Sequence, residues 1–126
     1  MPKDRIPEKL CDRIRKLDRR IRHVGYYDGF GRILYDSIRE NRVPLEGEEE
    51  THILNGTVAS TLNLWRPASP LVGKVESFII IREKIVGVIV PHKNQSYFLI
   101  IFEARTPNAD VERIRSKLVR AIALSS

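Results

Sequence analysis

The apolar residues at the start of the chain recur at the spacing of an amphipathic helix. Intervals of three and four residues place them on one narrow face. The stripe comprises Ile6, Leu10, Ile14, Leu17, Ile21 and Val24. Pro7 suits a first helical turn, where its missing N–H is not needed, and Gly25 marks an end. The pattern predicts a helix over residues 7–24.

The apolar period then changes to that of strands. Val24 to Tyr27 and Arg32 to Ile38 flank two glycines in the tetrapeptide Asp28-Gly29-Phe30-Gly31, and such glycines permit the positive φ of a tight turn. The segment is therefore predicted to form a β-hairpin. Because neighbouring strand residues point to opposite faces, one of Tyr26 and Tyr27 is expected in the core and the other on a contact surface.

A second helix is predicted from Glu48 to Trp65. Three glutamates lie in its first turn, where carboxylates meet the positive end of the helix dipole. The apolar positions of one side are Ile53, Leu54, Val58, Leu62 and Trp65. The sequence Arg66-Pro67-Ala68-Ser69-Pro70 is expected to end this helix, and residues 41–47 before it are expected to form a loop.

Three strands and a last helix complete the predicted order. Lys74 to Ile81, Ile85 to Val90 and Ser96 to Ala104 are rich in β-branched and aromatic residues, and the short connections between them require antiparallel neighbours. Thr106, as an N-cap, and Pro107 open a helix that continues through residue 122. The fold class is thus α+β, a five-stranded antiparallel sheet in the order helix-strand-strand-helix-strand-strand-strand-helix, in one domain over residues 1–126.

This order of elements resembles that of the roadblock/dynein light chain family, within the profilin-like and longin group. The segment Gly25 to Leu34 is similar to the family's first hairpin, in which a small residue and an Asp precede a glycine turn. Trp65, followed by Gly73 before a strand, is similar to the family's junction between helix and third strand. The chain also resembles small archaeal proteins.

The resemblance implies a homodimer that acts by binding. Two sheets would join along the strand Lys74 to Ile81, with the second helices packed across the two-fold axis. The implied partner is another protein, often a Ras-like GTPase whose hydrolysis is sometimes stimulated without a catalytic side chain being supplied. This chain departs from the family in its strongly basic first helix.

A physical argument also favours the dimer. An apolar edge strand such as Val75 to Ile81 invites uncontrolled pairing unless it is covered, and a second copy would cover it. Gly56 within a helix costs about 1 kcal/mol relative to alanine, a cost that close packing against another helix, or against the chain's own sheet, would explain. The predicted interface residues are Gly56, Ser60, Val75, Ser77, Ile79 and Ile81.

Charge is distributed unevenly along the 126 residues, whose net charge is +6. On a helix over residues 7–24, one flank carries a basic ridge of Lys9, Arg13, Lys16 and Arg20. Like charges at these spacings disfavour an isolated helix, so an anionic partner is one explanation: nucleic acid, a membrane surface or an acidic protein. A solvated ridge, or one paired with the acidic residues 46–50 of the same or a second subunit, is the favoured alternative, because aromatic residues for base stacking are lacking.

Few residues have the pattern of a reactive site. His23, His52 and His92 fall on separate elements and Cys11 has no ligand spacing around it, so neither a metal site nor a cofactor is expected. Cys11 is expected on a helix flank, and Asp28 before a glycine is typical of turn chemistry rather than of a general base. No catalytic residue is predicted. Because the first residues lack an apolar secretory stretch, a cytoplasmic location is expected.

The sequence and this resemblance therefore favour a non-enzymatic, dimeric adaptor or regulator that binds another protein. The partner class that the resemblance implies is a small GTPase. The second hypothesis is a basic nucleic-acid-associated protein that binds through the first helix. The third is a small-molecule sensor module with a pocket between sheet and helices. The longest apolar run, Phe98 to Phe102, is far too short to span a membrane.

Overall fold

The computed structural model describes residues 6–39 and 48–125, with backbone alone for residues 48–55. The predicted loop over residues 41–47 and the side chains of Ile53 and Leu54 lie outside the described residues. The elements, in chain order, are α1 (Ile6–Arg15), β1 (Ile21–Tyr27), β2 (Ile33–Ile38), α2 (Glu48–Trp65), the 3₁₀ turn η1 (Arg66–Ala68), α3 (Ser69–Val72), β3 (Phe78–Ile81), β4 (Val86–Pro91), the 3₁₀ turn η2 (Lys93–Gln95), β5 (Tyr97–Phe102) and α4 (Asn108–Ser125).

The five strands form one antiparallel sheet in the order β2-β1-β5-β4-β3. The central strand, β5, pairs with the first strand on one side and the fourth on the other, so the hairpin and the meander join into a single sheet. The predicted fold class is confirmed. The two edge strands of the sheet are β2 and β3.

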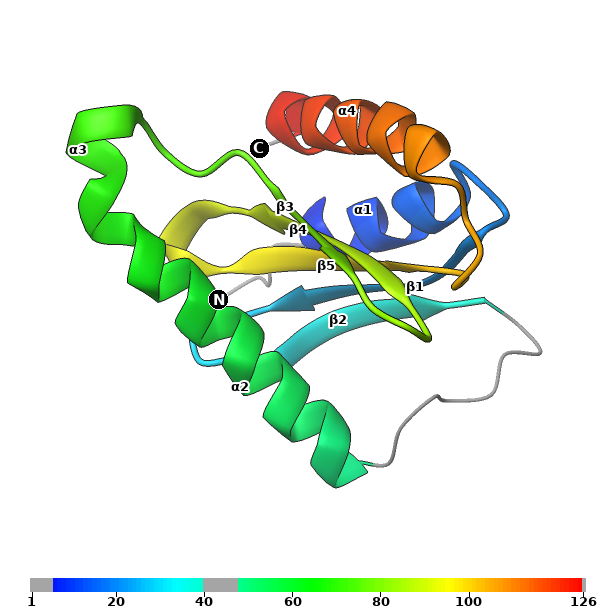
Figure 1. Ribbon diagram of the computed structural model, residues 1–126, viewed down its shortest axis with the longest axis horizontal. Coiled ribbons are helices and arrows are strands. Elements are labelled where there is room, and N and C mark those ends of the chain that lie inside the picture. The colour runs from blue at the N-terminus through cyan, green and yellow to red at the C-terminus, as the bar shows by residue number, and fades with distance from the viewer. Residues whose placement is uncertain (1–5, 40–47, 126) are drawn as a thin grey trace.

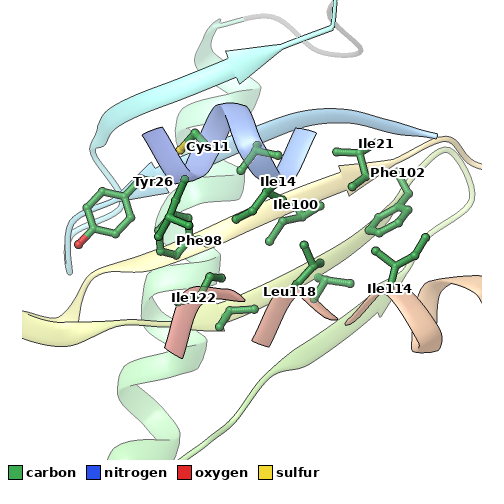
Figure 2. Packing of buried hydrophobic residues seen from close by; sticks show 14 of the residues in the cluster. Cys11, Ile14, Ile21, Tyr26, Phe98, Ile100, Phe102, Ile114, Leu118 and Ile122 are labelled. Atoms are coloured by element: carbon green, nitrogen blue, oxygen red, sulfur yellow. The ribbon is translucent and has the colours of Figure 1, made fainter. Parts of the chain in front are cut away.

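Helices cover both faces of the sheet. One face carries α1 and α4, which run in opposite directions, and α2 crosses the other face (Figure 1). Figure 2 places Cys11 and Ile14 of α1 above the core and Ile114 to Ile122 of α4 below it in the view. The molecule is therefore a three-layer sandwich.

The larger core lies between the sheet and the pair α1 and α4. Its central aromatic residues, Phe98 and Phe102, are fully buried, and every strand except the two edges contributes buried residues to it. The α4 residues of this core are spaced three and four apart, so they lie on one face of the helix, which points inward. They are Val111, Ile114, Leu118 and Ile122.

The smaller core lies under α2. From this helix only Val58, Ala59 and Leu62 are buried among the described side chains, and they meet Tyr97 and Leu99 on the sheet. Among the described side chains, this layer has seven buried residues and the opposite one sixteen.

The prediction of a first helix over residues 7–24 is wrong at its C-terminal end. The helix ends at Arg15, and Ile21 and Val24 belong to β1. A register shift between Ile21 and His23 in the pairing of β1 with β5 lets both apolar residues face the same core although they are three apart. The bulge in β1 therefore explains why the three-residue apolar spacing of a helix persists in a strand.

Arg39, just after β2, holds the end of α1 in place. Its guanidinium donates hydrogen bonds to the carbonyl oxygens of Arg15 (3.0 Å), Asp18 (2.9 Å) and Ile21 (2.9 Å). Carbonyls near a helix C-terminus lack intrahelical partners, and a planar guanidinium with several donors can satisfy them together. The turn between α1 and β1 is fixed in this way.

The remaining boundaries differ in smaller ways. The predicted bounds of the second helix are confirmed, because α2 ends at Trp65. The two short helical elements after it, η1 and α3, were not predicted; they continue until Gly73, whose φ of +86° stops the chain. The third strand starts at Phe78 rather than Lys74, β4 is shifted by one residue from the predicted Ile85 to Val90, and β5 is shorter at both ends than the predicted Ser96 to Ala104. Thr106 does not reach forward to α4 as an N-cap; its hydroxyl donates to the carbonyl of Glu103 at 2.8 Å.

The predicted hairpin turn is confirmed, together with the role of Asp28. Its carboxylate accepts hydrogen bonds from the backbone N–H groups of Phe30 (2.8 Å) and Arg32 (3.0 Å), and Gly31 has a φ of +86°. This is an Asx turn closed by a glycine.

Candidate functional site

The predicted interface residues of α2 lie on its outward side. Ser60 is exposed, and a Cβ built on Gly56 would have no atom within 4 Å. The explanation that Gly56 packs against its own sheet is therefore wrong. The four-residue spacing of Gly56 and Ser60 places them on one helix face, and Leu64, four residues further, continues it with 78% of its surface exposed.

The predicted interface residues near β3 occupy two different settings. Ile79 and Ile81 lie on the edge strand and are exposed, the latter by 61%. Val75 and Ser77 precede the strand and are half-buried. The hydroxyl of Ser77 lies 3.1 Å from a guanidinium nitrogen of Arg115, which ties this segment to α4.

Exposed apolar side chains continue beyond the predicted residues. Trp65, expected on the core side of its helix, is half-exposed, and α3 adds Leu71 and Val72 at 88% and 79% exposure. The α3 part was missed because the two prolines suggested only a helix end; the Leu-Val pair between Pro70 and Gly73 was the available signal. We call the residues of α2 and α3 among these the apolar surface: Gly56, Ser60, Leu64, Trp65, Leu71 and Val72. Ile79 and Ile81 pair with Val88 and Val86 of the larger core, so they point to the opposite face of the sheet.

The basic ridge does not form the predicted line along one helix. Lys9 and Arg13 are exposed on α1, but Lys16 follows the helix end and Arg20 lies in the turn before β1. Arg20 is moreover engaged within the chain: it donates to the carboxylates of Asp18 at 2.9 Å and Asp110 at 2.7 Å. The predicted ridge thus loses Arg20, while Lys9, Arg13 and Lys16 are exposed.

The pKa values of this ion-pair network are shifted in the expected directions. Hydrogen bonds from Arg20 lower the pKa of Asp18 to about 2. The same guanidinium, followed by Arg113, lowers the pKa of Asp110, and the two carboxylates raise the pKa of Arg20. These residues join the α1–β1 turn to the start of α4, so the network has a structural role.

The lone cysteine lies in the core and not on a helix flank as expected. Cys11 has no exposed surface, and burial, followed by the nearby charge of Asp12, raises the pKa of its thiol to about 12. A nucleophile requires the thiolate. Cys11 is therefore a packing residue.

Both tyrosines of the first strand are buried, so the expectation that one forms a contact surface is wrong. Tyr26 lies in the larger core, and its hydroxyl is 2.9 Å from Nδ1 of His92 and 2.7 Å from Oγ of Ser96. The Ser96 hydroxyl donates to the carbonyl of Lys93. Sequence reasoning missed this polar cluster, because its members are 66 and 70 residues from Tyr26.

Tyr27 faces the smaller core and stacks on Tyr97, with ring centroids 5.2 Å apart. Neither tyrosine is thus available to a partner. Across the described ranges, no three His, Cys, Asp or Glu side chains gather so that they could hold a metal ion. None of the helices in these ranges is long and apolar enough to cross a bilayer.

Solved structures with the same arrangement of elements are found over almost the whole chain. The gliding protein MglB of Thermus thermophilus is similar with a TM-score of 0.71 at 13% identity, over 99% of this chain and 93% of that one. A roadblock/LC7 domain from Streptomyces avermitilis is similar with a TM-score of 0.63 at 8% identity, over 92% and 93%. The chain has a roadblock-like fold.

A further MglB structure, described as having a tetrameric arrangement, is similar to this roadblock-like domain with a TM-score of 0.70 at 14% identity, over 99% and 93% of the two chains. No protein-family model matches the sequence, and no curated protein matches it. At identities this low, the agreement establishes the fold, and function must be argued from the surfaces of this chain.

Proposed function

We propose that this roadblock-like domain is a non-enzymatic, homodimeric module that binds and regulates another protein. The observation that carries the proposal is the apolar surface over α2 and α3, together with the open apolar edge of β3. Large aliphatic side chains such as Leu64 and Leu71 are exposed on the first of these. Contiguous apolar patches on a soluble domain mark sites of protein association.

The edge strand supports self-association. The backbone of Phe78–Ile81 pairs with β4 on one side only, and Ile79 and Ile81 add apolar side chains to the open edge. An unprotected edge of this kind is a template for pairing with another strand. A second copy related by a two-fold axis would satisfy both edges at once.

The outer face of α2 suits close helix packing. Gly56 and Ser60 present little side-chain volume, and between Glu50 and Arg66 the sequence has no Asp, Glu, Lys or Arg. Two copies of the helix can therefore approach without burying unpaired charge, which would be costly. The tetrameric arrangement described for one MglB structure is a further reason to test assembly of this chain.

A small Ras-like GTPase is the partner class we propose, on the resemblance to the roadblock family. Binding at the surface of a dimer, without a catalytic side chain from this protein, agrees with the burial of Cys11 and the use of Asp28 in a turn. The proposed role is recruitment or control of the GTPase.

Sedimentation velocity of the whole chain tests the dimer. Ser60→Arg places a long cation on the outer face of α2, whereas Ser116→Arg places the same side chain on an exposed position of α4. We expect the native chain and Ser116→Arg to sediment as dimers at micromolar concentration, and Ser60→Arg as a monomer. A monomeric native chain would refute the dimer.

Binding of purified Ras-like GTPases, loaded with GDP or with a non-hydrolysable GTP analogue, tests the partner class. We expect one member of a panel to bind in a nucleotide-dependent manner, and the isolated chain to hydrolyse no GTP. Equal binding of both nucleotide states by every GTPase in the panel, or no binding, would contradict this part of the proposal.

A further inference from the structure

The face of the molecule opposite α2 carries most of the exposed positive charge of the helices. Because α1 and α4 lie side by side in opposite directions, their outward residues form one continuous surface. We call it the basic face, and it consists of the exposed residues Lys9, Arg13, Lys16, Arg113, Lys117 and Arg120. Only the first three belong to the ridge predicted from sequence; the α4 residues join them through the fold.

These basic side chains have few acidic partners among the residues that the structure describes. Within the described residues, Arg113 reaches Asp110 at 3.2 Å, and the other five take part in no ion pair. The acidic residues of α4 pair with less exposed arginines instead: Asp110 with Arg20, and Glu112 with Arg115. Among the described residues, the positive charge of the basic face is therefore mostly not neutralised by acidic side chains.

Like charges also stand at neighbouring positions on each helix. Lys9 and Arg13 are four residues apart, as are Arg113 and Lys117, and such pairs destabilise a helix. The exposed acidic residues of the two helices are Glu8, Asp12 and Glu112, three against five exposed basic residues on the helices and Lys16 just after α1. An anionic partner would relieve the repulsion.

We propose that the basic face binds the surface of an anionic lipid bilayer. Two antiparallel helices on a sheet present a broad, shallow face, and such a face can place all its cations near a plane of lipid headgroups at the same time. A cluster of Lys and Arg near an anionic surface gains about fivefold in partitioning per residue. No helix that could span the bilayer is needed, because the contact is peripheral.

Aliphatic residues at the ends of these helices favour lipid over nucleic acid. Ile6 begins α1 and Leu17 follows its end, and both are about half-exposed; Leu124, near the end of α4, is 81% exposed. Aliphatic side chains beside cations can enter the boundary between headgroups and acyl chains. Neither helix contains a Phe, Tyr or Trp on which a nucleic-acid base could stack.

Co-sedimentation with vesicles tests the proposal. The native chain is mixed with vesicles of phosphatidylcholine alone, or with 30% phosphatidylserine, at roughly 0.1 M salt, where charges within about 10 Å interact. We expect binding to the phosphatidylserine vesicles and none to neutral ones, and release at about 0.5 M salt.

Two triple variants with equal loss of charge locate the surface. The first changes Lys9, Arg13 and Arg120 to Gln on the basic face. The control changes Arg32, Arg82 and Lys84 to Gln, exposed residues of the hairpin turn and the β3–β4 turn. The first variant is expected to bind on the order of a hundredfold more weakly, and the control less than fivefold more weakly. Circular dichroism checks that both variants fold.

Three outcomes would overturn the proposal. They are no binding of the native chain to anionic vesicles, an equal loss in the two variants, and binding of a 20-base-pair DNA duplex by the basic face without binding to vesicles. The last result would assign the face to nucleic acid instead. Because α2 lies on the other side of the sheet, failure here would leave the proposed dimer untouched, and the two outcomes are read separately.

Discussion

Gly25 is the position at which β1 makes room for an aromatic ring. A Cβ at this residue would lie 2.5 Å from Cε2 of Tyr27, whose ring folds back over the strand and stacks on Tyr97. Any side chain at position 25 must displace that ring, and with it part of the core under α2. The absence of a side chain at this position therefore determines how the smaller core is packed.

Replacement of Gly25 by Ala is predicted to destabilise the fold by about 1–3 kcal/mol, the usual cost of overpacking. Gly87→Ala is the matched control, because Gly87 is also a buried strand glycine but its added Cβ would meet its nearest atoms at 3.6 Å, an ordinary contact. Urea unfolding measures both free energies. A Gly25→Ala variant as stable as Gly87→Ala would contradict the role assigned to the Tyr27 ring.

The buried thiol gives a second prediction at this scale. Because Cys11 has a pKa of about 12 and no exposed surface, the folded chain at pH 8 contains almost no thiolate at this position. We expect a thiol reagent such as dithionitrobenzoate to leave the native chain unlabelled for hours and to label it within minutes in 6 M urea. Rapid labelling without denaturant would show that α1 opens readily.

Asp18 makes stability depend on pH in the acid range. Its pKa is about 2 in the folded chain against about 3.8 in the unfolded chain, so the unfolded chain binds the proton first as the pH falls. The contribution of this carboxylate to the free energy of unfolding is therefore fully present above pH 4 and decreases as the pH falls towards 2.

Asp18→Asn is expected to lower stability at pH 7 and to flatten this decrease. Glu83→Gln removes an exposed carboxylate in the β3–β4 turn and serves as the control. It should leave the loss of stability at low pH unchanged. Thermal unfolding between pH 2 and 7 measures both effects. If the stability of Asp18→Asn fell as steeply with decreasing pH as that of the native chain, the contribution of this carboxylate would be ruled out.

At the scale of elements, the two edge strands differ in what they leave exposed. Ile81 is 61% exposed on β3, whereas Ile33, half-exposed, lies on β2 at the opposite edge. Ile81→Lys is predicted to weaken self-association at least tenfold because an edge lysine blocks strand pairing. Ile33→Lys should have no such effect. Concentration-dependent light scattering distinguishes them, and equal weakening would mean that β3 is not the pairing edge.

All five strands and the hairpin turn could be predicted from the sequence, because strand period and turn chemistry act locally. Prediction failed where a distant partner decides. The bulge that places Ile21 beside Val24 exists only in the pairing with β5, and the end of α1 depends on Arg39, 24 residues after Arg15. Neither can be read from a local pattern.

The candidate site was predicted unevenly for the same reason. Gly56, Ser60, Ile79 and Ile81 were found because an unexplained glycine and an apolar edge strand are visible in sequence. The basic face was only half visible, since its α4 residues join those of α1 through tertiary packing. The polar contacts of Tyr26 left no sequence signal.

The molecule as a whole has two faces of opposite character. From Thr51 to Val72 the only Asp, Glu, Lys or Arg is Arg66, whereas the basic face exposes six cationic residues. The sheet separates these faces, so a partner on one face leaves the other accessible. Self-association and attachment to an anionic surface are compatible on this geometry.

Hydrogen exchange should report this division. Among the described side chains, α2 buries three residues and α4 four, so the α2 amides are expected to exchange faster than those of α4 in dilute solution. They should slow by about tenfold or more as the chain self-associates at higher concentration. The α4 amides should show no such dependence. Concentration-independent exchange in α2 would argue that this helix is not part of the contact between copies.

The chain also carries a built-in optical reporter. It has a single tryptophan, Trp65, which is half-exposed at the end of α2 on the apolar surface. Its emission maximum should shift to shorter wavelength when a second copy or a protein partner covers that surface, and should stay constant when vesicles occupy the opposite face. Intrinsic fluorescence of the unmodified chain can therefore distinguish events on its two sides without an added label.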